Sequence, residues 1–278
     1  MTVHTQPFFI VSSGRSGTKM FEKLLSGFDD VEIHHEYMIC HVQPLAARYA
    51  MGLVAADEVV ATLRSTHGAA VRYSEKRLWG DSSNKLSWVI PQLCELFPQA
   101  RFIFVVRDGR KVASSYFNKL GDEIYDDRSV RIMYGHLDDP AKNPPPPPEK
   151  RYWWKIPRNG EPMAERFRDF DQFQRIVYHW VEVNRTIERD LAGVDGARQI
   201  RLRLEDLVTD RTCLERLLAF LGLHYEERFF EMLKRPHNVS EPVNYPLTGR
   251  QREQFWEIAG EAMEHYGYGG TEEYEVRY

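Results

Sequence analysis

The amino-acid sequence predicts an α/β fold in which helices cover both faces of a largely parallel central sheet. Two observations support this prediction. Apolar runs short enough to be strands alternate along the chain with stretches of helical periodicity. The run at residues 102–106 is also uninterrupted and rich in aromatic and β-branched side chains, which is typical of a parallel strand buried on both faces.

The N-terminal half contains the predicted elements in the order strand, helix, strand, helices, strand. The first strand begins at about residue 7. The helix after it carries one apolar stripe, made of Met20, Phe21, Leu24, Leu25 and Phe28. Alternating side chains at 31–37 predict a second strand, and residues 41–68 and 86–97 are predicted to be helical. The strand at 102–106 and a helix after it complete this half.

The C-terminal half is predicted to be mainly helical. Apolar spacing favours a long amphipathic helix at 173–191, followed by a strand at 199–204. Two further helices follow, and their boundaries are marked by capping boxes and a glycine stop: Thr212 with Glu215, Thr248 with Gln251, and Gly222.

Composition indicates one folded domain, which we expect to span residues 1–278. The 278 residues, 42% of them hydrophobic, are enough for one well-packed α/β core and leave little for a second domain. A net charge of −4 gives no general attraction to nucleic acid, so a cationic site has to be local. Three cysteines without a pairing pattern suit a reducing compartment. With no apolar run long enough to span a membrane, we expect a cytoplasmic protein.

The segment after the first strand is predicted to bind an anion. Gly14 and Gly17 allow the backbone to turn its N–H groups toward one point, and the positive end of the following helix lies at the same point. The side chains around the loop add two cations and two hydroxyls: Arg15, Ser16, Thr18 and Lys19. This chemistry suits a phosphate or sulfate, and the alternative is a glycine turn with solvated charges.

A nucleoside triphosphatase or kinase loop is the first alternative for this segment. Its motif requires a glycine, four residues of any type, and then Gly-Lys followed by Ser or Thr. Aligned on Gly17, Ser12 replaces the opening glycine and Thr18 replaces the lysine that binds the β- and γ-phosphates. A kinase that uses ATP and Mg²⁺ is therefore disfavoured but stays an alternative.

A second group of polar residues follows the strand at 102–106. Ligands of open parallel sheets bind outside the carboxyl ends of the strands, so Arg107 is expected to point into the same crevice as the first loop. Ser115 lies eight residues further on, and eight residues return a helix to within roughly 80° of its starting direction. Arg107 and Ser115 are thus predicted to face one ligand.

These two segments together resemble the PAPS-dependent sulfotransferase family. The first matches its [KR]-[ST]-G-T loop, and the second matches its R-[DN]-x-[RK]-x-x-x-x-S signature. The resemblance implies a P-loop NTPase-like sulfotransferase fold. It also implies that residues 15–18 hold the 5′-phosphosulfate of 3′-phosphoadenosine-5′-phosphosulfate (PAPS), and that Arg107 and Ser115 hold its 3′-phosphate. The product would be adenosine 3′,5′-bisphosphate (PAP).

The chain departs from the family pattern at two places. Lys19 stands where the family usually carries a second threonine, so this cation is expected to bind the phosphosulfate as well. In the segment 79–85, Ser82 stands where the family carries its sulfate-contacting lysine. We hypothesise that Lys19 or Lys85 replaces that lysine.

Sulfuryl transfer requires a general base and several cations, and in principle no metal. By analogy with phosphoryl transfer, Arg15 is expected near the bridging oxygen. Glu36, at the end of the predicted second strand, is the preferred base, and His35 is the nearest competitor. A zinc site at Cys40 and His41 is disfavoured because the usual ligand spacings are missing.

Residues 121–169 are predicted to be an insertion outside the core. Acidic residues are followed by Pro144–Pro148, which favour polyproline II structure, and then by Trp153 and Trp154. The resemblance suggests a lid whose tryptophans wall the acceptor pocket; the alternatives are a pinned surface loop and an SH3-type ligand. The segment 235–242 stands where family members close a loop over the adenosine.

The sequence as a whole predicts transfer of a sulfuryl group from PAPS to an acceptor hydroxyl, or with less support an amine. The acceptor is expected to be a small molecule, a carbohydrate or a lipid. A nucleotide-binding module without turnover is the second alternative, because it would keep Arg15, Arg107 and Ser115 but need no base.

Overall fold

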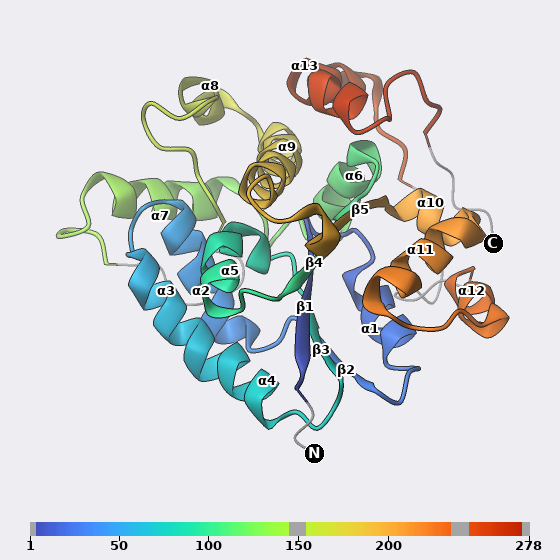
Figure 1. Cartoon of the computed structure of the whole chain (residues 1–278). Helices are drawn as coiled ribbons and strands as arrows, with labels where there is room; N and C mark the ends of the chain where they lie inside the picture. Colours follow the sequence, from blue (N-terminus) through green and yellow to red (C-terminus); the bar gives the residue numbers. More distant parts are fainter. Residues whose placement is uncertain (1–3, 145–153, 235–244, 274–278) are drawn as a thin grey trace.

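The computed structural model describes residues 4–144, 154–234 and 245–273. Within these residues lies a five-stranded parallel sheet with the strand order β2-β3-β1-β4-β5 (Figure 1). The strands are β1 (Gln6–Ser12), β2 (Val31–His35), β3 (Leu78–Ser82), β4 (Arg101–Val106) and β5 (Gln199–Arg203). The predicted α/β fold with a parallel sheet is confirmed.

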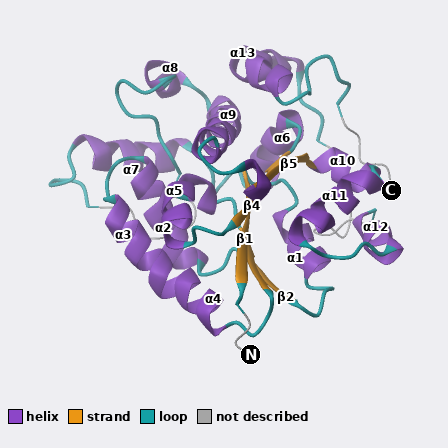
Figure 2. Cartoon of the chain, viewed as in Figure 1, coloured by secondary structure: helices purple, strands orange, loops and turns teal. Residues whose placement is uncertain are grey.

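Helices lie on both faces of the sheet (Figures 1 and 2). Alternate side chains of the central strands pack against these two layers of helices. Phe9 and Val11 of β1 belong to the larger apolar cluster, whereas Phe8 and Ile10 belong to the smaller one. The larger cluster includes side chains of α2 (Ile39–Ala50), α3 (Ala56–Leu63), α5 (Ile90–Leu96), α6 (Gly109–Lys119), α9 (Gln172–Leu191) and α13 (Gly249–His265). The smaller cluster includes α1 (Thr18–Leu25), α11 (Arg211–Leu221) and α12 (Glu227–Leu233).

Strand β3 was not predicted, although it lies between β1 and β2. All five of its residues are buried, so it shows no alternation of apolar and polar side chains. Gly80 is required by close packing, because a Cβ atom there would lie 2.2 Å from Cζ of Phe8. A short strand containing glycine, aspartate and serine gives no sequence signal that separates it from a loop.

The helix predictions are largely confirmed. The stretch 41–68 holds two α-helices, which are separated near Gly52 (φ 69°), followed by a π-helical turn at Arg64–Gly68 and α4 (Ala69–Tyr73). The capping box of Thr248 and Gln251 at the start of α13 is confirmed. The predicted end of α11 at Gly222 is also confirmed. The box at Thr212 is wrong, because Asp210 caps α11 instead by accepting the Thr212 N–H at 2.9 Å.

The prediction that 121–169 lies outside the core is wrong for the part that is described. This region forms α7 (Asp127–Asp138) and α8 (Ala164–Asp169), and it adds fully buried side chains to the larger cluster, among them Ile124, Tyr125 and Phe167. Their apolar side chains are isolated among charged and proline residues, which hides the pattern. Residues 145–148 and Trp153 lie outside the described residues, as does the segment 235–242.

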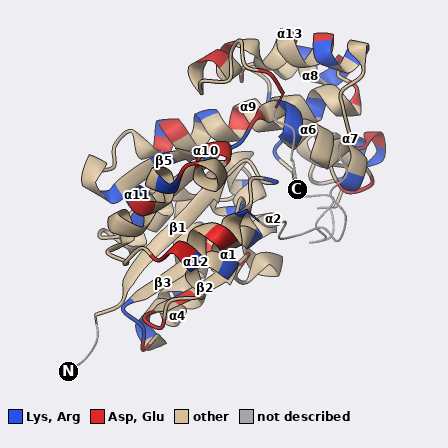
Figure 3. Cartoon of the chain, turned by 90° about the vertical axis from the view of Figure 1, so that its right-hand side faces the viewer, with Lys and Arg blue, Asp and Glu red and all other residues tan. Residues whose placement is uncertain are grey.

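Among the described residues, no helix is both long and apolar enough to cross a bilayer. Lysine, arginine, aspartate and glutamate side chains are interspersed on the helices in the side view (Figure 3). The short helix α10 (Leu204–Thr209) connects β5 to α11.

Candidate functional site

The site is built at the edge of the sheet where all five strands end. The pairing register places His35 of β2 and Ile10 of β1 beside Ser82 of β3, and Ser12 of β1 beside Val105 of β4. The loop after β1 therefore lies between the carboxyl ends of β3 and β4. This is the position at which ligands of open parallel sheets bind.

The loop between β1 and α1 has the backbone of an anion cradle. Gly14, Arg15 and Gly17 have φ values of 84°, 52° and 79°, so the chain turns through the left-handed region three times. Among the described residues, the backbone N–H groups of 15–19 have no hydrogen-bond acceptor. The first turn of α1 also lacks both an acidic residue and a side-chain cap. These N–H groups and the helix dipole are available to a negatively charged group.

Gly14 is needed for space as well as for backbone conformation. A Cβ atom at this position would lie 1.9 Å from Oη of Tyr116 and 2.7 Å from Nδ2 of Asn84. Asn84 follows β3, and Tyr116 lies in α6. The loop therefore passes directly over a polar pair from two other elements, and a larger residue would displace it.

Arg15, Arg107 and Ser115 meet as the sequence predicts. Nε of Arg15 donates to Oγ of Ser115 at 2.9 Å, and Nη1 of Arg107 donates to the carbonyl oxygen of Arg15 at 2.5 Å. Burial lowers the pKa of Arg107, and the Arg15 cation lowers it further, while the carboxylate of Glu205 opposes the shift. Burial and the charges of Arg15 and Arg107 also lower the pKa of Lys119. Arg15, Arg107 and Lys119 thus place three positive charges near one another at the loop after β1.

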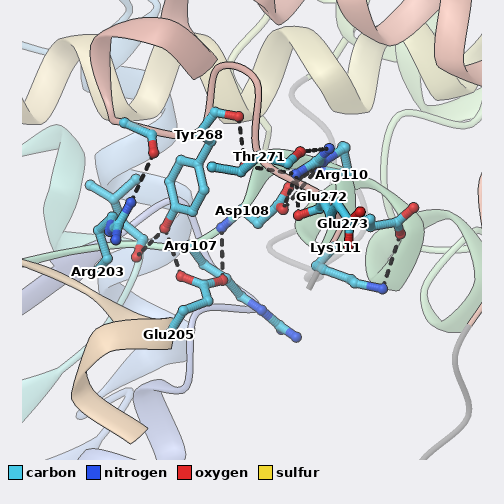
Figure 4. Close-up of polar contacts among 12 residues, drawn as sticks. Arg107, Asp108, Arg110, Lys111, Arg203, Glu205, Tyr268, Thr271, Glu272 and Glu273 are labelled. Atoms are coloured by element: carbon cyan, nitrogen blue, oxygen red, sulfur yellow. Dashed lines mark hydrogen bonds and ion pairs between the residues drawn. The ribbon is translucent and has the colours of Figure 1, made fainter. Parts of the chain in front are cut away.

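The N-terminus of α6 is braced by acidic and C-terminal residues (Figure 4). Glu205 accepts hydrogen bonds from the Asp108 N–H at 3.1 Å and from the Tyr268 hydroxyl at 2.7 Å. Arg110 forms an ion pair with Asp108 at 2.7 Å and donates to the carbonyl oxygen of Thr271 at 3.1 Å. These contacts fix the direction in which Arg107, at the end of β4, enters the site.

Glu36 and His35 both lie at the end of β2. Glu36 is half-buried, has a φ of 57°, and donates its N–H to the carbonyl oxygen of Ser82 at 3.2 Å. Burial raises the pKa of Tyr116, and the Glu36 carboxylate raises it further, so this carboxylate acts on the hydroxyl beneath the loop. His35 donates from Nδ1 to the same Ser82 carbonyl at 2.9 Å. The structure brings both predicted bases to the rim of the site.

The lysine candidates occupy different environments. Lys19 is exposed in the first turn of α1, beside the cradle. Lys85 is buried, and its Nζ lies 3.7 Å from the ring centroid of Trp154. Trp154 is itself buried and donates from Nε1 to the carbonyl oxygen of Glu123 at 2.7 Å, so it packs in the interior. Ser82, which replaces the expected lysine, donates to the Thr18 carbonyl oxygen at 2.8 Å.

The comparisons with known proteins agree with this geometry. Residues 7–140, which hold the cradle, β4 and α6, match the profile described as "Sulfotransferase family". This segment, a little less than half of the chain, is similar to the sulfotransferase family. Among curated members, the chain is similar to the omega-hydroxy-beta-dihydromenaquinone-9 sulfotransferases Stf3 of Mycobacterium bovis and Mycobacterium tuberculosis, with 28% identity over 186 residues. The match covers 66% of this chain and 39% of those proteins.

One solved sulfotransferase structure shares the fold at low identity. Sulfotransferase STF9 from Mycobacterium avium superimposes with a TM-score of 0.50 at 11% identity, covering 95% of this chain and 77% of that one. A mouse sulfotransferase complexed with PAP gives a TM-score of 0.47 at 14% identity, covering 93% of this chain and 85% of that one.

Two residues that contact the loop between β1 and α1 were not predicted from the sequence. Tyr116 and His179 both donate hydrogen bonds to the Ser13 carbonyl oxygen, at 3.1 and 3.2 Å. Tyr116 could have been noticed as the neighbour of Ser115. His179 lies in the long amphipathic helix α9, far along the chain, and its neighbours in sequence are those of a core residue. Within the described residues, no group of three or more His, Cys, Asp or Glu side chains is placed to hold a metal ion.

Proposed function

We propose that this protein transfers the sulfuryl group of PAPS to an acceptor hydroxyl, with an amine as the second choice. The observation that supports this most is that the two segments predicted to bind anions, the loop after β1 and the start of α6, meet at one edge of the sheet. The cradle of free N–H groups lies beside Arg15, which contacts Ser115 and Arg107. A donor with a phosphosulfate at one end and a 3′-phosphate at the other requires two such elements.

In this proposal, the donor is held by fixed cations and backbone dipoles. Residues Arg15, Ser16, Gly17, Thr18 and Lys19 would bind the phosphosulfate. Arg107 and Ser115 would bind the 3′-phosphate, because both reach the crevice from β4 and α6. Arginine suits both anions, since its planar group stays charged and can donate two parallel hydrogen bonds.

The reaction follows from the same arrangement. The acceptor oxygen forms a bond to sulfur while the bond from sulfur to the bridging phosphate oxygen breaks, and PAP leaves. Glu36 would accept the proton of the acceptor hydroxyl, with His35 as the alternative base. Arg15 would stabilise the negative charge that develops on the bridging oxygen. Lys19 or Lys85 would supply the positive charge at the sulfate, because Ser82 stands where the family carries a lysine.

The acceptor class is proposed from the relatives. Their names describe a hydroxylated dihydromenaquinone, so a lipid-like acceptor with a free hydroxyl is our first candidate among lipids, carbohydrates and small molecules. We further propose that residues 1–278 form one sulfotransferase domain and that part of 121–169 closes over the acceptor. The cytoplasmic location stays a prediction.

The proposal is tested by product analysis. Purified protein is incubated with PAPS and a panel of hydroxylated lipids, sugars and phenols, and sulfated products are identified by mass spectrometry. We expect a sulfated product and equimolar PAP with at least one acceptor class. Tight PAP binding without product from any acceptor would favour the non-catalytic module, and phosphorylated product from ATP and Mg²⁺ would favour the kinase.

A further inference from the structure

The carbonyl oxygen of Ser13 is held by two buried side chains from two different helices. Oη of Tyr116, in α6, donates to it at 3.1 Å. Nε2 of His179, in α9, donates to it at 3.2 Å. Both side chains belong to residues that are only 2% exposed. Ser13 is the first residue after β1, so this carbonyl stands where the strand becomes the cradle.

The contact with Ser13 fixes which ring nitrogen of His179 carries a hydrogen. A carbonyl oxygen only accepts hydrogen bonds, so Nε2 of His179 must carry its hydrogen. Nδ1 lies 3.3 Å from the Tyr125 hydroxyl, which donates to the carbonyl oxygen of Lys155 at 2.6 Å. Burial first, and then the Lys85 charge, lower the pKa of His179 to about 3, although the bond to Ser13 acts in the opposite direction. His179 is therefore a neutral donor with one tautomer near pH 7.

The ring of His179 is also fixed by packing. The ring of Trp154 meets it edge-on at 5.3 Å between centroids, and the ring of Tyr116 does so at 5.7 Å. Trp88 and Tyr125 contact it at 6.3 and 5.7 Å. A ring enclosed in this way keeps its Nε2–H directed at Ser13 when the site is empty.

Holding one carbonyl fixes the peptide plane that begins the loop. Gly14 follows directly and lies against Tyr116, so the loop cannot move toward α6. One residue before Tyr116, Ser115 of the same helix contacts Arg15. Helices α6 and α9 thus hold the loop at Ser13 and Arg15, on either side of Gly14. In this arrangement, the N–H groups of 15–19 have no hydrogen-bond acceptor among the described residues, so they are available to a ligand.

We propose that His179, acting with Tyr116, is a positioning residue that preorganises the donor-binding loop. A loop that is ordered before binding loses less conformational freedom when the donor arrives, so donor affinity rises. The identity of this ligand rests on the proposed function. The effect on the loop itself does not, because it is a property of the empty protein.

The test compares His179→Phe, which keeps the ring but removes the donor, with His179→Gln, whose side-chain N–H can again reach the carbonyl. His136→Phe is the matched control, because His136 is another buried histidine that bonds a backbone carbonyl, that of Asn143 at 3.0 Å. Thermal unfolding first establishes that each variant is folded. Amide hydrogen exchange is then measured without ligand at Gly14, Met20 and Phe21, whose N–H groups donate to Ser12 and Gly17 in and after the loop. PAP affinity is measured by calorimetry.

We expect His179→Phe to speed amide exchange at Gly14, Met20 and Phe21 and to weaken PAP binding by about tenfold or more. His179→Gln should restore most of both properties, and His136→Phe should change neither. Unchanged exchange in a folded His179→Phe protein would overturn the proposal, as would a His179→Gln protein that behaves like His179→Phe. If the wild-type protein does not bind PAP, the proposed function fails while the exchange experiment still decides the role of His179.

Discussion

The side chains of Arg15 and Ser115 form a hydrogen bond of 2.9 Å across a sequence separation of 100 residues. One residue belongs to the loop after β1 and the other to α6, so this bond joins the two segments that the sequence singles out as anion-binding. Arg107 completes the group by donating to the Arg15 carbonyl oxygen. The two halves of the proposed donor site are therefore in direct contact.

Gly14→Ala tests the close approach of the loop to α6. The new Cβ would lie 1.9 Å from Oη of Tyr116 at a φ of 84°, so the loop has to shift. We expect a loss of about 2 kcal/mol in the free energy of unfolding and a clear loss of PAP affinity. Chemical denaturation and calorimetry measure the two effects. Gly193→Ala, which meets nothing within 4 Å, is the control, and equal behaviour of the two variants would contradict the packing argument.

Glu36→Gln tests the proposed general base. The amide cannot accept the acceptor proton, so we expect kcat to fall by about 10²-fold or more while PAP affinity stays the same. Steady-state kinetics and calorimetry provide the two readouts. His35→Gln is measured in parallel. A normal kcat in Glu36→Gln together with a reduced kcat in His35→Gln would transfer the role to His35.

Alanine substitution of Lys19 and of Lys85 tests which cation replaces the lysine missing at Ser82. Loss of a cation that stabilises the developing charge should lower kcat by about tenfold or more in one of the two variants. Lys23→Ala is the control for a general effect of charge, because Lys23 is exposed in the last turn of α1. If both variants turn over like the wild type, neither lysine has this role.

The depressed pKa of His179 predicts a loss of stability in acid. An unfolded histidine has a pKa of about 6.5, whereas burial lowers the pKa of His179 to about 3 in the folded protein. Below about pH 6.5 the unfolded state binds a proton that the folded state does not, so the free energy of unfolding falls by about 1.4 kcal/mol per pH unit from this group.

Denaturation of wild-type and His179→Gln proteins between pH 7.5 and 5 checks this dependence. The wild type should lose more stability over this range, because glutamine does not titrate. Parallel pH profiles for the two proteins would show that His179 is not buried as a neutral group.

Local patterns explain why much of the fold and half of the site could be predicted from the sequence. The cradle, β4 and α6 each have a continuous signal, and the rule for the carboxyl ends of parallel strands places Arg107 and Ser115 beside the loop. The contact of His179 with Ser13 could not be predicted, because nothing in the pattern of an amphipathic helix indicates that its histidine meets a loop 166 residues away. Strand β3 and the buried residues of 121–169 were missed for a related reason. Their burial depends on partners that are distant in the sequence.

Calorimetric titration with PAP, and separately with ATP, tests the central claim most directly. Each titration is run with and without Mg²⁺, on wild-type protein and on Arg107→Ala. We predict tight, Mg²⁺-independent binding of PAP that weakens by about tenfold or more in Arg107→Ala, because this variant loses a cation from the proposed 3′-phosphate site. A preference for ATP that depends on Mg²⁺ would contradict the sulfotransferase assignment of this site and favour a kinase.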